Sequence, residues 1–181
     1  MARLRLATIA CVVLAALAPP AFAARTLPHA TTTPPPPSNT SSSTADEYLT
    51  PHNQARAAVG VPPLTWSTNL ATTAAATTAA QQQRGRCEFA DMGASQYGAN
   101  QGWASYPARP GEVVAAWVAQ GRYYAHGNNS CAPGQQCGTY TQVVWRRTSQ
   151  VGCAQATCAT GATLTVCLYY PHGNVQGQSP Y

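Results

Sequence analysis

Apolar residues recur with a helical period through much of the chain and with a strand period near its C-terminus. The first helix is predicted over residues 44–58, where Thr44 as N-cap and Glu47 at N3 fit a capping box. Gly60 then ends this helix, and Pro51 inside it predicts a kink or a late start.

Two further helices are predicted from the same spacing. One follows Pro63, and its many threonines give it only fair helix propensity, so that packing must hold it. Its apolar face comprises Trp66, Leu70, Ala74 and Ala75. The other covers residues 110–124 and has an apolar stripe of Val113, Val114 and Trp117.

Two strands are predicted over residues 150–158 and 162–170, joined by a short turn. Helices at both ends of the region, a few strands between them and no internal repeat indicate a layered α+β domain. We place this domain at residues 44–181.

The N-terminal residues 1–24 have the pattern of a secretory signal peptide. Arg3 and Arg5 form a basic region, residues 6–17 an apolar core, and residues 21–23 a small-x-small cleavage site. The apolar run is too short to span a bilayer and no second candidate follows it, so no transmembrane segment is expected. The mature chain is therefore expected to be exported.

Residues 25–43 form a linker rich in proline, threonine and serine. Its polar runs cannot bury enough apolar surface to fold, and the prolines at 34–37 favour an extended left-handed helix. Asn39 and Asn128 each begin an N-glycosylation sequon. The simplest interpretation of the linker is a spacer ahead of the domain.

The charge pattern argues against a nucleic-acid partner. Every basic side chain is arginine, and after removal of the signal peptide eight arginines face five acids. A nucleic-acid surface needs a dense basic stripe, whereas these arginines are scattered apart from two close pairs at 84/86 and 146/147.

Six cysteines remain once Cys11 leaves with the signal peptide. An even number in an exported domain implies disulfides, and six cysteines allow about fifteen connectivities. A zinc site is disfavoured because the chain has no CxxC pair and the expected compartment is oxidising.

One set of pairings agrees best with the predicted turns. Cys131 and Cys137 enclose a Pro-Gly turn, and Cys158 and Cys167 flank the turn between the two predicted strands. The remaining two cysteines would then form a long-range bridge. The predicted disulfides are therefore Cys87–Cys153, Cys131–Cys137 and Cys158–Cys167.

Several motifs occur in the order found in one family of secreted proteins. Residues 138–145 read GTYTQVVW and resemble the signature GHYTQVVW, and residues 167–174 resemble a second signature, CNYxPxGN. Residues 52–56 match HNxxR, while YGAN at 97–100 resembles YGEN and WVAQ at 117–120 resembles WVxE. From about residue 46 to 181 the chain thus resembles the CAP superfamily (SCP domain), and within it plant pathogenesis-related protein 1.

The resemblance implies a three-layer α-β-α sandwich in which residues 139–144 are a short helix rather than the strand their valines suggest. It also favours the cysteine pairing given above. His52, Asn53 and Arg56 are interpreted as structural, hydrogen-bonded side chains, because no serine or cysteine nucleophile is marked as their partner.

The family's metal-binding tetrad of two histidines and two glutamates falls at Asp91 (or Met92), Ala99, Gln120 and Thr139. None of these residues keeps the expected side chain. A transition metal needs three or four imidazole or thiolate donors, and Ca²⁺ needs six or more oxygens. We therefore expect no metal, no cofactor and no enzymatic activity, since general acid–base chemistry also needs such groups.

Two functions do not need the tetrad. The family includes sterol carriers, and the loop 100–107 with Trp103 and Tyr106 is the candidate wall of a lipid site; alternatively these aromatics only cover the sheet edge. The tail 171–181 resembles a defence-signalling peptide released by cleavage between Tyr170 and Pro171, which would need a processing protease and a receptor.

The tail has a second interpretation, in which Pro180 and Tyr181 pack on the domain. The overall expectation is a secreted, monomeric, non-enzymatic plant defence protein of the apoplast. An extracellular protein-interaction module, or less favourably a hydrolase, is the alternative.

Overall fold

The computed structural model describes residues 43–85 and 87–181, so the predicted signal peptide and nearly all of the linker, including Asn39, lie outside the described residues. The helices are α1 (Thr44–Ala58), α2 (Thr68–Gln83), α3 (Pro110–Ala119) and α4 (Gly138–Val143), with 3₁₀ helices η1 (Gln120–Tyr123) and η2 (His126–Asn128). The strands are β1 (Thr65–Trp66), β2 (Gly98–Ala104), β3 (Tyr124–Ala125), β4 (Ser130–Cys131), β5 (Gln150–Thr157) and β6 (Thr163–Tyr170). None of the helices in the described part of the chain has the length and apolar character needed to cross a membrane.

Four strands form one sheet in the order β1-β5-β6-β2. The predicted C-terminal strands are confirmed as the antiparallel pair β5 and β6, and β1 joins β5 in parallel. Strand β2 pairs with β6 along its whole length and forms an edge of the sheet. β3 and β4 make a separate two-stranded ribbon.

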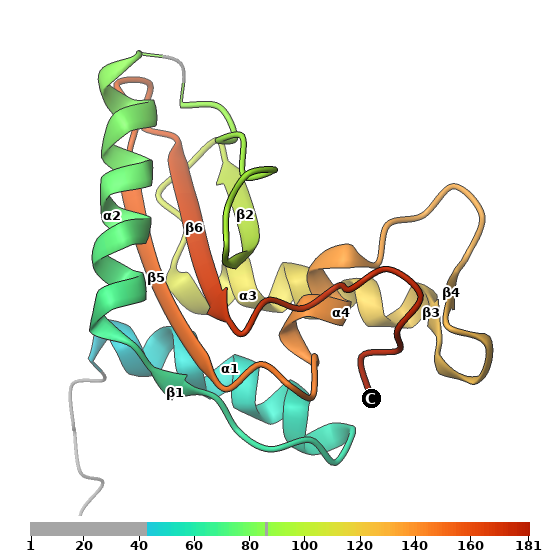
Figure 1. The fold of residues 1–181 in the computed structure, drawn as a ribbon. Helices are drawn as coiled ribbons and strands as arrows, with labels where there is room; N and C mark the ends of the chain where they lie inside the picture. The colour runs from blue at the N-terminus through green and yellow to red at the C-terminus, as the bar shows by residue number, and fades with distance from the viewer. Residues whose placement is uncertain (1–42, 86) are drawn as a thin grey trace, which may run out of the picture. The chain divides into compact units, whose positions relative to one another are not determined.

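The alternation of side chains along β6 creates the three layers. Val166 and Leu168 point to one face, where they pack against Leu70 and Ala74 of α2. The intervening residues point to the other face, into a core shared by α1, α3 and α4. Figure 1 shows α2 running alongside β5 and β6. The expected three-layer α-β-α sandwich is confirmed.

Gly152 allows α2 to approach the sheet closely. A Cβ atom at this position would lie 2.5 Å from Ser67 O and would also overlap the backbone nitrogen of Ala71. Any side chain on Gly152 would therefore push the first turn of α2 away from β5.

The first helix has the predicted span, Thr44–Ala58, but its N-cap lies one residue earlier than predicted. Ser43, not Thr44, is the N-cap: its Oγ accepts from Asp46 N, and the Asp46 carboxylate accepts from Ser43 N. The helix continues through Pro51 to Ala58 because buried Tyr48 and His52 anchor the turns on either side of the proline.

The second helix starts later than predicted. Trp66 lies in β1, and Ser67 caps α2 by accepting from Leu70 N. The buried face is formed by Leu70, Ala74, Thr78 and Gln81, whereas Ala75 is exposed. Because pairing with β5 fixes β1 in the sheet, the chain must turn at Ser67 before it can become helical.

The remaining helices lie close to their predicted positions. Val113, Val114 and Trp117 are buried along α3 as predicted, and the predicted final turn is the 3₁₀ helix η1. The short helix implied for residues 139–144 is confirmed as α4. The expected loop 100–107 is only partly a loop, because its first five residues belong to edge strand β2.

The structure contains three disulfides among the described residues, and only one predicted pairing is confirmed, Cys131–Cys137. The predicted bridges Cys87–Cys153 and Cys158–Cys167 are wrong. The observed bridges are Cys87–Cys158 and Cys153–Cys167.

Strand register explains the exchange of partners. The β5–β6 pairing places Cys153 directly opposite Cys167, with Cα atoms 4.0 Å apart. Cys158 lies at the turn itself, where its backbone nitrogen donates to Ala162 O. Cys87 follows α2 to the same end of the sheet and bonds Cys158 across a Cα separation of 5.9 Å.

Candidate functional site

Arg56 is a fully buried cation with neutral partners. Its Nε donates to Pro62 O at 2.6 Å, its Nη1 to the carbonyls of Val143 and Trp145, and its Nη2 to Thr148 O. These bonds tie α1 to the end of α4 and the segment that follows. Burial lowers the pKa of Arg56 to about 10, so the group stays charged at neutral pH.

His52 is held between two buried groups. Its Nδ1 lies 2.8 Å from Tyr48 O, which only accepts, so Nδ1 carries the proton and Nε2 accepts from Tyr169 Oη at 2.8 Å. Asn100 Nδ2 donates in turn to Tyr169 Oη. Burial, supplemented by the charge of Arg56, lowers the pKa of His52 to about 4, so the ring is neutral.

These contacts support a structural role for the HNxxR residues. Asn53 likewise makes two bonds to the backbone of Leu64. In the part of the chain that the structure describes, no serine or threonine hydroxyl is bonded to His52. The arrangement lacks the nucleophile–base contact that acyl transfer requires.

Three of the four tetrad positions come together. Ala99, Gln120 and Thr139 line a cavity of about 430 Å³ beside α4. Asp91 is exposed and bonds Gly93 N instead, whereas Met92 lines a neighbouring hollow of about 420 Å³. Of the two positions predicted for the family's first histidine, Met92 lines this neighbouring hollow, whereas Asp91 lines neither hollow.

The chemistry of this cavity does not fit a metal. Its other lining residues are Asn100, Gln136, Cys137, Gly138 and Asn174. The carbonyl oxygen of Gln120 accepts from Thr139 N at 3.2 Å, and Cys137 is in a disulfide. Across the described residues no group of three histidine, cysteine, aspartate or glutamate side chains is placed to share an ion. An amide-rich lining is a poor ligand set for zinc.

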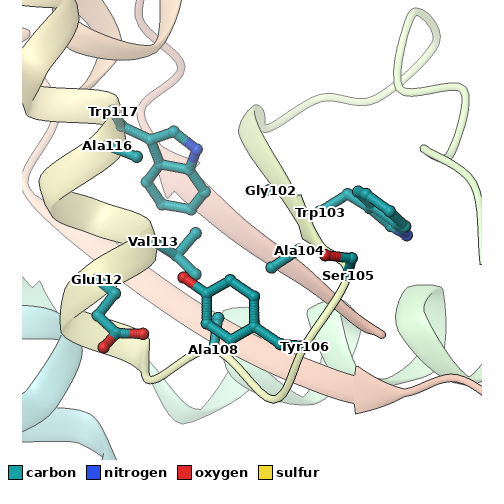
Figure 2. A pocket seen from close by; sticks show the side chains of 10 residues that line it. All are labelled: Gly102, Trp103, Ala104, Ser105, Tyr106, Ala108, Glu112, Val113, Ala116 and Trp117. Carbon is teal, nitrogen blue, oxygen red and sulfur yellow. The ribbon is translucent and has the colours of Figure 1, made fainter. Parts of the chain in front are cut away.

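A second candidate site is an apolar groove between edge strand β2 and α3. It has a volume of about 360 Å³, and Figure 2 shows Val113 and Trp117 reaching from α3 toward Tyr106 and the strand. Tyr106 is 55% exposed at its mouth. Glu112 lies at the rim, where its carboxylate accepts from the backbone nitrogen of Arg109.

Gly102 allows this groove to form. A Cβ atom there would lie 2.5 Å from the Val113 side chain and 3.5 Å from Trp117. The Trp117 indole donates to Gln101 O at 3.2 Å, which fixes its ring against the strand. The wall formed by α3 is therefore rigid.

Trp103 separates this groove from a second hollow of about 450 Å³ on the other side of the strand. Trp103 is 54% exposed, and Phe89, which also lines the second hollow, is 58% exposed. The Gln101 amide bonds both the nitrogen and the oxygen of Ala90, and so holds the Phe89 segment beside β2. Phe89 was missed from sequence because a single phenylalanine after Cys87 carries no pattern.

The C-terminal tail packs on the domain. Pro180 is buried and accepts from Arg146 N, while the Tyr181 ring stacks on His126 with centroids 4.4 Å apart. Tyr181 Oη also lies 3.2 Å from Tyr140 Oη. These contacts match the packed-tail interpretation. At the other end of the tail, Tyr170 is 49% exposed.

The bond between Tyr170 and Pro171 lies at the end of β6. Tyr170 O accepts from Ser149 N, and Pro171 O accepts from the Thr148 hydroxyl. A protease would have to break both hydrogen bonds before the segment could enter an active site. Any cleavage here therefore requires local opening.

Comparison with known proteins identifies the relatives of the chain. The profile of the family "CAP: Cysteine-rich secretory protein family" matches residues 49–169. The STS14 protein of Solanum tuberosum is 48% identical over 139 residues, which cover 76% of this chain and only 65% of that protein. Pathogenesis-related protein 1C of Nicotiana tabacum is 45% identical over 136 residues, covering 75% and 79% of the two chains.

A solved structure supports the fold. Schistosoma mansoni venom allergen-like protein 4 is 26% identical, with a TM-score of 0.57 over 77% of this chain and 94% of that one.

Proposed function

Because this chain belongs to the cysteine-rich secretory protein family, CAP, we propose that it is an extracellular, non-enzymatic plant defence protein that binds a sterol or similar lipid. The similarity to pathogenesis-related proteins of tobacco supports the defence role. Three disulfides among the described residues are typical of proteins that fold in an oxidising, exported compartment.

The observation that carries the lipid proposal is the apolar groove beside Trp103 and Tyr106. Exposed apolar patches often mark binding sites, and here Phe89, Trp103 and Tyr106 are each more than half exposed around one edge strand. The α3 wall is rigid, whereas the Tyr106 side follows the end of β2 and has no strand partner of its own. A flat, rigid apolar ligand such as a sterol suits this pair of walls.

A labelled-sterol binding assay on the secreted protein tests the proposal. Replacing Trp103 or Tyr106 by alanine removes apolar contact area, so each variant is expected to bind about tenfold more weakly. Tyr170→Ala is the matched control, because Tyr170 is also half exposed but lies far along the sheet from this groove. Absence of saturable sterol binding by the wild type would contradict the proposal.

Release of the C-terminal peptide 171–181 is a second candidate function. The exposed Tyr170–Pro171 junction favours it, and a processing protease and a receptor would be the partners. Mass spectrometry of extracellular fluid from stressed tissue tests it. A fragment that begins at Pro171 is the expected result, and a persistently intact C-terminus would support a purely structural tail.

A further inference from the structure

We propose that the cavity at Gln120 and Thr139 and the hollow next to it form one groove that binds a neutral oligosaccharide. This site is distinct from the lipid groove and does not depend on it. The two hollows share Ala99 and Asn174 in their linings and have volumes of about 430 and 420 Å³. Each of these volumes lies in the range of about 300–1,000 Å³ that is typical of ligand sites.

The first hollow offers hydrogen-bonding groups of both kinds. The Gln120 oxygen is already bonded to Thr139 N, which leaves its two amide hydrogens for a ligand. Asn100 uses its amide hydrogens on Thr139 O and Tyr169 Oη, which leaves its carbonyl oxygen. Gln136 is exposed and lines the same hollow. Sugar hydroxyls donate and accept together, so they match such a set.

The groove has no carboxylate, ammonium or guanidinium group, which decides the class of ligand. The residues that line the two hollows, all within the described part of the chain, include one histidine, His172, but no aspartate, glutamate, lysine or arginine. An ionic ligand would lose hydration here without gaining an opposite charge. A neutral polyol instead exchanges its water hydrogen bonds for amide ones.

One aromatic ring lines the far end of the groove. Tyr97 lines the second hollow and is half-buried, and its ring meets Tyr170 edge to face with centroids 6.3 Å apart. An aromatic ring at this position provides an apolar surface for the C–H face of a sugar.

The floor of the groove is fixed before any ligand arrives. Asn100 is 2% exposed and is joined through Tyr169 to buried His52. Gln142 is 1% exposed, accepts from Gly173 N and donates to Thr148 Oγ1. Side chains held in this way bind a ligand without a large loss of conformational entropy.

Calorimetric titration of the full secreted protein tests the inference. The probes are laminarihexaose and cellohexaose, both neutral glucose hexamers, and an oligogalacturonate of similar length, which is acidic. We expect saturable binding of at least one neutral hexamer. Gln136→Ala and Tyr97→Ala should each bind it about tenfold more weakly, because each loses one contact at opposite ends of the groove.

Gln135→Ala is the matched control, since Gln135 is the exposed neighbour of Gln136 but does not line the groove. Gln135→Ala should bind the neutral hexamer as the wild type does. Trp103→Ala should also bind it normally, and this result would distinguish the oligosaccharide site from the lipid groove. The inference is overturned if neither neutral hexamer binds, if Gln135→Ala and Gln136→Ala bind equally, or if oligogalacturonate binds more tightly than both.

Discussion

Tyr169 of β6 donates its hydroxyl hydrogen to Nε2 of His52 in α1, across the core between the sheet and the helix. The bond fixes the neutral form of His52, and burial raises the pKa of Tyr169, so the hydroxyl keeps its proton. The same hydroxyl accepts from Asn100, whose other bond reaches α4. Through Asn100, a pair of residues 117 positions apart thus connects four elements of the domain, α1, β6, β2 and α4.

Stability should fall with acid in a way that His52 controls. The folded pKa of His52 is lowered from 6.5 to about 4, so the unfolded chain binds the extra proton in this interval. His52 therefore makes its full contribution to the free energy of unfolding above pH 6.5. This contribution, about 3 kcal/mol, is lost as the pH falls toward 4. Urea unfolding at several pH values measures this.

His52→Gln is the control for this measurement, because the five acids common to both proteins cancel in the difference. The wild type should lose more stability than the variant between pH 6.5 and 4. Parallel pH profiles for the two proteins would contradict a buried, neutral His52.

Loss of the Arg56 side chain should destabilise the domain strongly. Arg56→Met leaves four backbone carbonyls without their donor, so we expect a loss of about 3 kcal/mol or more in the free energy of unfolding. Arg84→Met, at the exposed end of α2, should change it by less than about 0.5 kcal/mol. Equal effects in urea titrations would show that Arg56 is not a structural centre.

The Tyr48 hydroxyl should be dispensable. It is buried without a hydrogen-bond partner among the described residues, and burial together with nearby Glu47 raises its pKa to about 12. Tyr48→Phe removes this unsatisfied group but keeps the ring stacked on Trp66. We expect the melting temperature to stay the same or rise, with a gain of up to about 1 kcal/mol. A clear loss would reveal a hidden partner of the hydroxyl.

Gly152→Ala should disrupt the packing between α2 and the sheet. Its Cβ would meet backbone atoms rather than a movable side chain, so a loss of about 2 kcal/mol is expected. At Gly138 a Cβ meets nothing within 4 Å, so Gly138→Ala is the matched control and should not destabilise the protein. Thermal unfolding of the two variants gives the comparison, and similar melting temperatures would contradict the close approach.

Zinc should not bind at the cavity with useful affinity. Calorimetric titration of the wild type with zinc is expected to show no stoichiometric site at micromolar concentration, since Gln120 and Thr139 are weak ligands. The double variant Gln120→Glu with Thr139→His supplies two stronger donors and should bind more tightly. Micromolar stoichiometric binding by the wild type would contradict the proposed loss of metal chemistry.

Local sequence features predicted much of the fold and part of the candidate sites. The stripe of Val113, Val114 and Trp117 on α3 and the two C-terminal strands follow from side-chain periodicity, which depends on near neighbours. The family motifs located Ala99, Gln120 and Thr139, which the structure brings into one cavity. Phe89, which lines the hollow beside Trp103, and Gln136, which lines the cavity at Gln120, belong to no such motif. Their places in these hollows follow only from the tertiary structure.

The sequence by itself determined three of the helices, the strands β5 and β6, the α+β class and the absence of the expected ligands from the tetrad positions, because each depends on residue type and short-range spacing. Only the tertiary structure decided that Cys153 pairs with Cys167 and Cys87 with Cys158. Disulfide pairing depends on the register of β5 and β6 and on where the chain leaves α2 ahead of Cys87. Both are set by packing between segments that are distant in sequence. For the same reason only the folded domain shows that the tail lies against α4 and that β2 exposes Trp103 at an edge.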